Sequence, residues 1–319
     1  MVIYFLSVII LAASLLVYFR LAVRYGIVDK PNERSSHSQA TIRGAGILFP
    51  IAAMLWFVFK GFPQPWMIAG LLIVAVVSFT DDLVTLSGSI RLAAQVIAIT
   101  LMFIQMHLFG LAWYILIPLY IAVIGWINAF NFMDGINAIT PFYSLVSLGT
   151  FLYMASQDSF FDRSLLVLLI LAMVIFSFFN ARRRARAFAG DVGSVSMAYL
   201  LAFLLLSLTG NTGRWEYSLF FLVYATDAVF TILIRLRRRE NIFRAHRSHL
   251  YQLLSNELGW PHLLVALLYA VVQLAINILI VVLIRQGMMS LVVFLVIVAA
   301  LSLVYLGIRW FVGKRSRSF

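Results

Sequence analysis

The sequence predicts an all-α polytopic membrane protein, and three observations support this fold class. First, 63% of the 319 residues are hydrophobic and only 11% are charged, whereas a soluble domain is about 45–50% apolar and about 25% charged. Second, the apolar residues form segments long enough to cross a bilayer. Third, the basic residues gather in alternate loops. Together they exclude a soluble globular protein.

About eleven apolar segments are long enough, or nearly so, to cross a hydrocarbon core of about 30 Å. Several of them are short, and the segment 45–60 is marginal. Eleven spans of about 20 residues use roughly 220 residues, so residues 1–319 are expected to form a single integral membrane domain. In chain order the expected spans are 1–19, 45–60, 64–80, 92–107, 110–127, 138–156, 163–180, 193–210, 216–234, 262–284 and 288–311.

The basic residues predict the orientation of these spans. The formal net charge of +12 would suggest nucleic-acid binding in a soluble chain. With the N-terminus outside, however, 20 of the 24 Lys and Arg residues fall in inner loops, and only Lys60, Arg163, Arg214 and Arg285 fall outside. This bias predicts an outer N-terminus and a cytoplasmic C-terminus. It explains the charge without nucleic acid.

Two further features concern processing and redox chemistry. The first span has no cation before it and is followed by Arg20 and Arg24, the reverse of a secretory signal, so we expect it to remain as an anchor. The chain has no cysteine, which excludes disulfides and thiolate metal sites.

The few acidic residues indicate where a site lies, because a carboxylate near the bilayer centre costs a few kcal/mol unless it is paired, hydrated or used. Asp81, Asp82, Asp134 and Asp191 lie at the inner ends of different spans, so we expect them to converge on one cytoplasmic site. Asp227 lies inside the ninth span. For it a hydrogen-bonded structural seam is the favoured interpretation, and a site role is the alternative.

Asp81 and Asp82 form an adjacent acidic pair in the loop after the third span. Two neighbouring carboxylates repel each other, so a cation is expected beside them. Arg91 is the local candidate and a divalent ion is the other. The alternative is a solvated loop in which one aspartate caps a helix.

A polar stripe follows in WINAFNFMDGINAI, residues 126–139, where Asn128, Asn131, Asp134 and Asn137 recur every third residue. On a helix this spacing places them along one side. Unpaired amides are expensive in lipid, so the stripe must face protein, water or ligand. A seam between helices is the alternative to a site, and amide and carboxylate oxygens suit Mg²⁺.

Two later segments carry further candidates. In GDVGS, residues 190–194, Asp191 is framed by glycines that we expect to let a ligand approach the backbone; an ordinary helix cap is the alternative. The final inner loop carries His246, Arg247 and His249 after a run of arginines, which suits phosphate oxygens. Topology alone explains the arginines but not the histidines, and HRSH lacks the partners of a zinc site.

In this order, DDLVTLSGSIR, NAFNFMDGIN, GDVGS and HRSHLYQ resemble the motif series of the polyprenyl-phosphate N-acetylhexosamine-1-phosphate transferases, also called glycosyltransferase family 4. The opening DKPNERSSHSQATIRGAG is similar to that family's first cytoplasmic loop. The resemblance implies a ten- or eleven-span bundle in the bacterial inner membrane with a cytoplasmic active site. It also implies Mg²⁺, or Mn²⁺ in its place, and transfer of a sugar-1-phosphate from a UDP-N-acetylhexosamine to undecaprenyl phosphate. A loose homodimer is a further expectation.

The resemblance also assigns roles to residues. Asp191 and Asn131 would be metal ligands, and Asp81, Asp82 and Asp191 the catalytic acids. Whether the acidic pair removes a proton or only positions the metal and Arg91 stays open. The expected substrate-binding residues are Arg91, Asn128, Asp134, His246, Arg247, His249, Lys30, Arg34 and His37.

Departures from the family pattern bear on the substrate. The branch that builds the muramoyl-pentapeptide lipid has a histidine triplet in the final loop and a lysine after the acidic pair, whereas this chain has HRSH and Thr85. The resemblance therefore favours the branch that initiates O-antigen or related polysaccharides, with UDP-GlcNAc or a UDP-deoxy-N-acetylhexosamine as donor. Ala138 stands where a glycine is common in the family.

Two other classes of function remain as alternatives. A transporter or lipid flippase would line a path across both halves of the membrane with polar residues, but here they crowd one side. A CDP-alcohol phosphotransferase would carry several aspartates on one helix after a DG pair, and only Asp134 and Gly135 fit. A lipid phosphatase is a further enzyme alternative.

Overall fold

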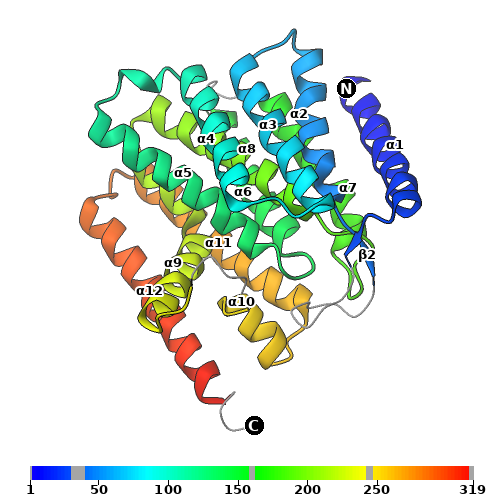
Figure 1. Ribbon diagram of the computed structural model, residues 1–319. Helices are drawn as coiled ribbons and strands as arrows, with labels where there is room; N and C mark the ends of the chain where they lie inside the picture. The colour runs from blue at the N-terminus through cyan, green and yellow to red at the C-terminus, as the bar shows by residue number, and fades with distance from the viewer. Residues whose placement is uncertain (1, 30–39, 158–161, 242–246, 316–319) are drawn as a thin grey trace.

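The computed structural model describes residues 2–29, 40–157, 162–241 and 247–315 (Figure 1). Its helices run in chain order as α1 Val2–Tyr25, α2 Leu48–Phe59, α3 Pro65–Leu83, α4 Gly88–Gln105, α5 Trp113–Met133, α6 Ile139–Gln157, α7 Arg163–Asn180, α8 Gly190–Thr212, α9 Leu222–Arg237, α10 Leu250–Gln252, α11 His262–Arg285 and α12 Leu291–Arg315. Strands β1 Val28–Asp29 and β2 Thr41–Ile42 form a small antiparallel pair.

The structure confirms a helical polytopic membrane protein. Each expected span coincides with a helix, and in the described part of the chain nine helices are long and apolar enough to cross a membrane. The marginal segment forms the short apolar helix Ala45–Phe59. Helix α6 also falls outside the nine, because its buried face carries hydroxyl groups such as Thr140, Ser144 and Ser147. The exact number of spans and their orientation remain predictions.

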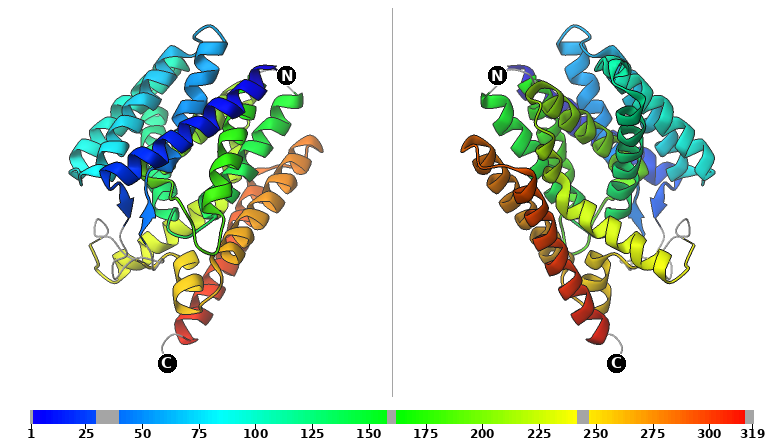
Figure 2. Two further views of the ribbon diagram at one scale, coloured as in Figure 1. Left: turned by 90° about the vertical axis from the view of Figure 1, so that its right-hand side faces the viewer. Right: turned by 90° about the vertical axis from the view of Figure 1, so that its left-hand side faces the viewer.

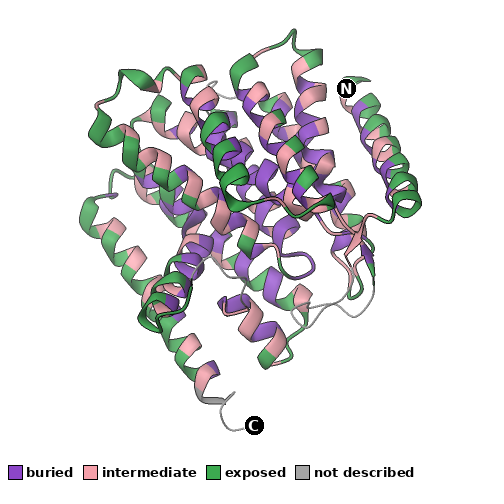
Figure 3. Cartoon of the chain, viewed as in Figure 1, coloured by how far each residue is buried: buried purple, intermediate pink, exposed green. Residues whose placement is uncertain are grey.

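Helix α8 forms the centre of the bundle. In its most apolar window 78% of the residues are buried, against 22% in α1 and 6% in α12, and it packs on α3, α5 and α2. Figure 3 shows buried residues gathered on the inner helices, whereas α1 and α12 are largely exposed. The apolar exposed faces of these outer helices suit contact with lipid.

The two termini lie at opposite ends of the bundle (Figure 2).

Beside the end where α1 leads into the strand pair, residues 42–46 run along the segment that precedes α8. Phe188 N donates to Ile42 O at 2.8 Å, Ala45 N to Phe188 O at 3.0 Å, and Gly46 N to Ala189 O at 2.9 Å. These bonds pair the non-helical backbone groups and bring the first long loop to the start of α8.

Candidate active site

The start of α8 is held by Asp82 from the end of α3. The Asp82 carboxylate accepts hydrogen bonds from the backbone N–H groups of Asp191 at 2.9 Å and Val192 at 3.1 Å. The first N–H groups of a helix lack partners within the helix, and a carboxylate there also interacts favourably with the helix dipole. The Asp82 side chain is fully buried, so this contact fixes where Asp191 lies.

Arg43 bridges the two carboxylates. Its Nε lies 2.6 Å from Asp82 Oδ1, and its Nη2 lies 3.2 Å from Asp191 Oδ1. The carbonyl oxygen of Arg43 accepts a hydrogen bond from the Tyr18 hydroxyl at 2.5 Å, which ties this segment to α1. Burial alone would lower the pKa of Arg43, but Asp82 and Asp191 outweigh it and raise that pKa above its usual value. The guanidinium therefore stays charged.

Arg43 was not among the site residues predicted from the sequence. The signal that pointed to it was weak, since it lies in a polar loop beside Gly44 and Gly46. Its two partners are distant in sequence, and Asp191 is separated from it by 148 positions. Only the fold brings these residues together.

The glycines around Asp191 serve protein packing rather than ligand approach, which corrects the expectation from the sequence. A Cβ on Gly193 would lie 2.7 Å from the Cα of Gly46, and one on Gly190 would lie 2.5 Å from Asp82 Oδ2 and 2.8 Å from the Cα of Gly44. Gly190 also has a φ of +71°, which favours glycine. The backbones of loop and helix approach so closely that no side chain fits between them.

Asp81 faces other partners than Asp82. Its Oδ2 lies 3.2 Å from Arg91 Nη1, and its Oδ1 accepts a hydrogen bond from Leu86 N at 2.6 Å. The Leu86 contact closes the turn between α3 and α4. Arg91, the local cation predicted for the acidic pair, thus pairs with Asp81, whereas Asp82 pairs with Arg43.

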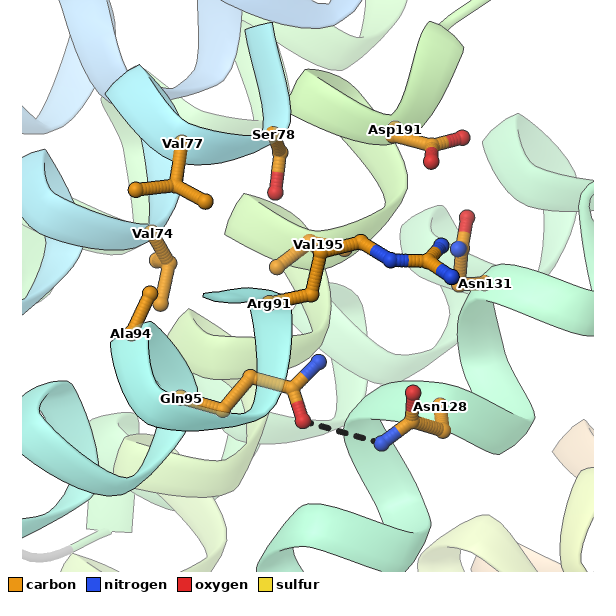
Figure 4. Close-up of a pocket in the computed structure, with 10 residues that line it drawn as sticks. All are labelled: Val74, Val77, Ser78, Arg91, Ala94, Gln95, Asn128, Asn131, Asp191 and Val195. Carbon is orange, nitrogen blue, oxygen red and sulfur yellow. Dashed lines mark hydrogen bonds between the residues drawn. The ribbon is translucent and has the colours of Figure 1, made fainter. Parts of the chain in front are cut away.

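Four predicted residues line one pocket between α3, α4, α5 and α8 (Figure 4). The pocket encloses about 330 Å³, part of it open to solvent. Arg91 extends across it toward Asn131 (Figure 4). Asn128 donates to Gln95 Oε1 at 2.9 Å, and Asn131 Oδ1 accepts from the Ser194 hydroxyl at 2.6 Å. The lining residues are Val74, Val77, Ser78, Arg91, Ala94, Gln95, Asn128, Asn131, Asp191 and Val195.

The polar stripe divides where α5 ends. Helix α5 stops at Met133, so Asp134 and Asn137 do not continue the helical face, which corrects the expected four-residue stripe. Asn137 Nδ2 donates to Arg182 O at 2.8 Å and so ties two loops together. Ala138 has a φ of +70°, a conformation that favours glycine and explains why a glycine suits this position.

Asp134 lies just beyond α5, and its Oδ1 accepts a hydrogen bond from the Thr140 hydroxyl at 2.5 Å. Burial raises the pKa of Asp134 to about 7, against the effect of the Thr140 bond, and the negative charges of Asp191 and Asp82 raise it further. This carboxyl therefore titrates near neutral pH.

Two predicted residues of the final loop, Arg247 and His249, do not line the pocket. The His249 side chain is almost wholly buried; its Nδ1 lies 3.2 Å from Asp227 Oδ1, and the residue caps α10. Arg247 is partly buried. The predictions for Lys30, Arg34, His37 and His246 concern residues outside those that the structure describes.

The oxygen atoms of the pocket fit magnesium. In the described part of the chain, no three His, Cys, Asp or Glu side chains form a cluster that would hold a metal. Mg²⁺ does not need such a cluster, because it commonly uses one or two protein oxygens together with substrate phosphates and water. Asp191, with a side chain 20% exposed, and Asn131 offer such oxygens in one pocket.

Comparisons with known proteins agree with this description. The family model for glycosyl transferase family 4 matches residues 65–209. A probable undecaprenyl-phosphate N-acetylglucosaminyl 1-phosphate transferase of Bacillus subtilis (strain 168) is 25% identical over 73% of this chain and 70% of the relative. The undecaprenyl-phosphate alpha-N-acetylglucosaminyl 1-phosphate transferase of Salmonella typhi is 28% identical over the same shares. A phospho-N-acetylmuramoyl-pentapeptide-transferase of Enterococcus faecalis (strain ATCC 700802 / V583) is 32% identical, but over only 35% of this chain and 34% of the relative.

Fold, pocket and relatives together support a polytopic membrane enzyme of the phosphosugar transferase class. Within that class, the matched family model and the relatives support the polyprenyl-phosphate N-acetylhexosamine-1-phosphate transferase family.

Proposed function

We propose that the protein transfers an N-acetylhexosamine-1-phosphate from a UDP-sugar to undecaprenyl phosphate and releases UMP. The observation that carries the proposal is the group formed by Arg43, Asp82, Asp191 and Asn131 at one end of the helical bundle. The names of the relatives support both the lipid acceptor and the transferred group. We place the reaction at the cytoplasmic face of the bacterial inner membrane, because most cations lie in the loops on that side.

Phosphoryl transfer depends chiefly on positioning and on neutralising charge. Asp191 and Asn131 would hold Mg²⁺, or Mn²⁺ in its place, and the bound ion would neutralise the pyrophosphate of the donor. Arg91 lines the same pocket and binds phosphate oxygens there by charge-assisted hydrogen bonds. Asp82 and Arg43 keep the Asp191 carboxylate in place.

The acceptor phosphate does not require a strong base. A phosphate monoester has a second pKa near 6, so at neutral pH it is already mostly a dianion. Both oxygens of Asp82 are engaged by Arg43 and by backbone N–H groups, and both oxygens of Asp81 by Arg91 and Leu86. We therefore assign the acidic pair a positioning role, Asp82 toward Asp191 and Asp81 toward Arg91.

The product we propose is the first lipid-linked sugar of a surface polysaccharide such as O-antigen. The donor is UDP-GlcNAc or a UDP-deoxy-N-acetylhexosamine. Two observations support this branch over the pentapeptide branch. The relatives named for N-acetylglucosamine match nearly three quarters of the chain, whereas the pentapeptide transferase matches about a third. The final loop reads HRSH without a histidine triplet.

The test is a panel of UDP-N-acetylhexosamines assayed on the purified protein with Mg²⁺, with and without undecaprenyl phosphate. We expect UMP release that requires the lipid phosphate, together with a lipid-linked sugar phosphate as product. No release with any donor of the panel would contradict the proposal and favour a transporter or flippase. Release of inorganic phosphate from the lipid would favour a phosphatase. The homodimer stays a prediction, for which mass measurement in detergent is the test.

A further inference from the structure

The Asp227 carboxylate, in α9, lies inside the bundle and outside the pocket. The residue is fully buried, with 0% of its surface exposed. In a membrane interior such a group costs a few kcal/mol unless it is paired or hydrogen-bonded. Hydrogen-bond partners must offset this cost. The partners of Asp227 therefore identify the segments that its carboxylate connects.

Donors to Asp227 come from four parts of the chain. The Thr231 hydroxyl, one turn away in α9, lies 3.1 Å from Oδ1, and the Tyr269 hydroxyl of α11 lies 2.7 Å from Oδ2. The Tyr305 hydroxyl of α12 lies 3.1 Å from Oδ1. An ionised carboxylate can only accept, so each of these hydroxyls donates. The carboxylate thus connects three membrane helices.

The fourth part is the segment that ends the last inner loop. His249 Nδ1 and Leu250 N lie 3.2 and 3.0 Å from Oδ1 of Asp227, and Tyr251 N lies 3.5 Å from Oδ2. Because the carboxylate has no proton to donate, Nδ1 of His249 carries the hydrogen. One buried group therefore fixes both the backbone of residues 250–251 and the orientation of the histidine ring.

Helix α12 is attached to this group by polar contacts. Arg309 Nη1 donates to the Tyr305 hydroxyl at 2.7 Å and to the Thr231 hydroxyl at 3.3 Å. Only 6% of the most apolar window of α12 is buried, and the helix packs on the outside of α9 (Figure 1). Apolar contacts such as that of Phe294 with Trp215 also hold the helix, and the bonds around Asp227 add a polar connection to the bundle.

The same segment also contacts the end of α5. The Tyr251 hydroxyl donates to the carbonyl oxygen of Phe132 at 2.8 Å. A Cβ on Gly135 would lie 2.2 Å from that hydroxyl oxygen. The Tyr251 side chain therefore packs closely against the backbone at Phe132 and at Gly135, before and after Asp134. Phe132 directly follows Asn131, the amide that lines the pocket. Hydrogen bonds of Asp227 and of Tyr251, which meets Asp227 through its backbone and Phe132 through its side chain, therefore link α12 to the polar end of α5.

We propose that Asp227 is a positioning residue, through which α12 fixes residues 249–251 and, by way of Tyr251, the pocket end of α5. Its effect on transfer rests on the proposed function; the anchoring itself does not. On this account α12 stabilises the site although none of its described side chains lines the pocket.

Hydrogen exchange tests the anchoring without any assay of activity. In the full chain in detergent, Tyr305→Phe removes one hydroxyl that donates to Asp227, and we expect faster exchange at the amides of Leu250 and Tyr251. Tyr114→Phe is the matched control, because it also removes one hydroxyl but from an exposed tyrosine of α5. Unchanged exchange in Tyr305→Phe would overturn the proposal.

A double-mutant cycle tests the connection to the site. We expect Tyr305→Phe and Tyr251→Phe each to lower kcat/KM about tenfold, the loss of one hydrogen bond in such a chain. The double variant should lose clearly less than the product of the two effects, because both act through one chain. A purely structural role would change the unfolding temperature and leave the two kinetic effects multiplicative.

The outcomes separate the two proposals. Faster exchange with non-multiplicative kinetics supports the positioning role, and multiplicative effects overturn the connection to the site. If the wild type transfers no sugar phosphate from any donor, the proposed function fails. Hydrogen exchange in Tyr305→Phe then still tests the anchoring, because it does not depend on activity.

Discussion

Arg43→Gln is the substitution that best tests how the site is built. It removes a guanidinium that contacts Asp82 at 2.6 Å and Asp191 at 3.2 Å, and it leaves a fully buried carboxylate without its cation. Breaking a fully buried pair costs about 3–5 kcal/mol, but the Arg43 side chain is 34% exposed, so water compensates part of the loss. The range for hydrogen bonds to charged groups, about 1.5–3 kcal/mol, therefore applies.

If this loss displaces the start of α8, it lowers kcat/KM by roughly 10- to 150-fold. The kcat/KM of Arg43→Lys should fall between those of Arg43→Gln and wild type. The single ammonium of a lysine reaches only one of the two carboxylates well. Arg184→Gln removes the same charge from an exposed position in the loop between α7 and α8 and is the control. UMP release by the purified variants is the assay, with thermal unfolding to verify the fold. Arg43→Gln with kcat/KM within about twofold of wild type would refute the reasoning.

Two further predictions concern packing and pH. Gly193→Ala places a Cβ 2.7 Å from the Cα of Gly46 and should lower the free energy of unfolding by about 1–3 kcal/mol. Gly210→Ala, in the same helix but with open space around it, should be neutral or slightly stabilising. Equal unfolding temperatures for the two variants would contradict this prediction. The folded pKa of Asp134, about 7, lies above its usual value, so the stability due to the protonated carboxyl is complete below about pH 4 and is lost as pH rises through 7. The stability of Asp134→Asn relative to wild type should therefore rise between about pH 4 and 7 and stay constant at higher pH. Unfolding temperatures of both proteins, measured in EDTA across this pH range, are the check. A difference between the two proteins that does not change with pH would contradict the prediction.

Much of the fold followed from the sequence, because the bilayer sets the length of each apolar segment. The ends of the helices did not. Helices α3 and α5 continue to Leu83 and Met133, past the predicted ends at residues 80 and 127, since polar residues that leave the apolar core still form helical hydrogen bonds. Hydropathy indicates where a helix leaves the membrane, and it does not indicate where the helix stops.

The site was predictable where the residues themselves are unusual for a membrane chain. Asn128, Asn131 and Asp191 attract attention because polar groups are costly there, and they do line one pocket. The role of Arg43 depends on a backbone approach between Gly46 and Gly193, which no local pattern reveals. The contact between His249 and Asp227 likewise depends on tertiary packing across 22 positions.

The central claim is that Asp191, held by Asp82 and Arg43, serves a metal-dependent transfer of sugar phosphate. Its most direct test is UMP release from the active UDP-N-acetylhexosamine, measured with undecaprenyl phosphate over a Mg²⁺ titration, for wild type and Asp191→Asn. Asp162→Asn, which changes the aspartate that caps the start of α7 and does not line the pocket, is the control. The account predicts Mg²⁺-dependent release by wild type and the control, and none by Asp191→Asn with its fold retained. Full activity of Asp191→Asn, or release by wild type that is independent of Mg²⁺ and Mn²⁺, would contradict it.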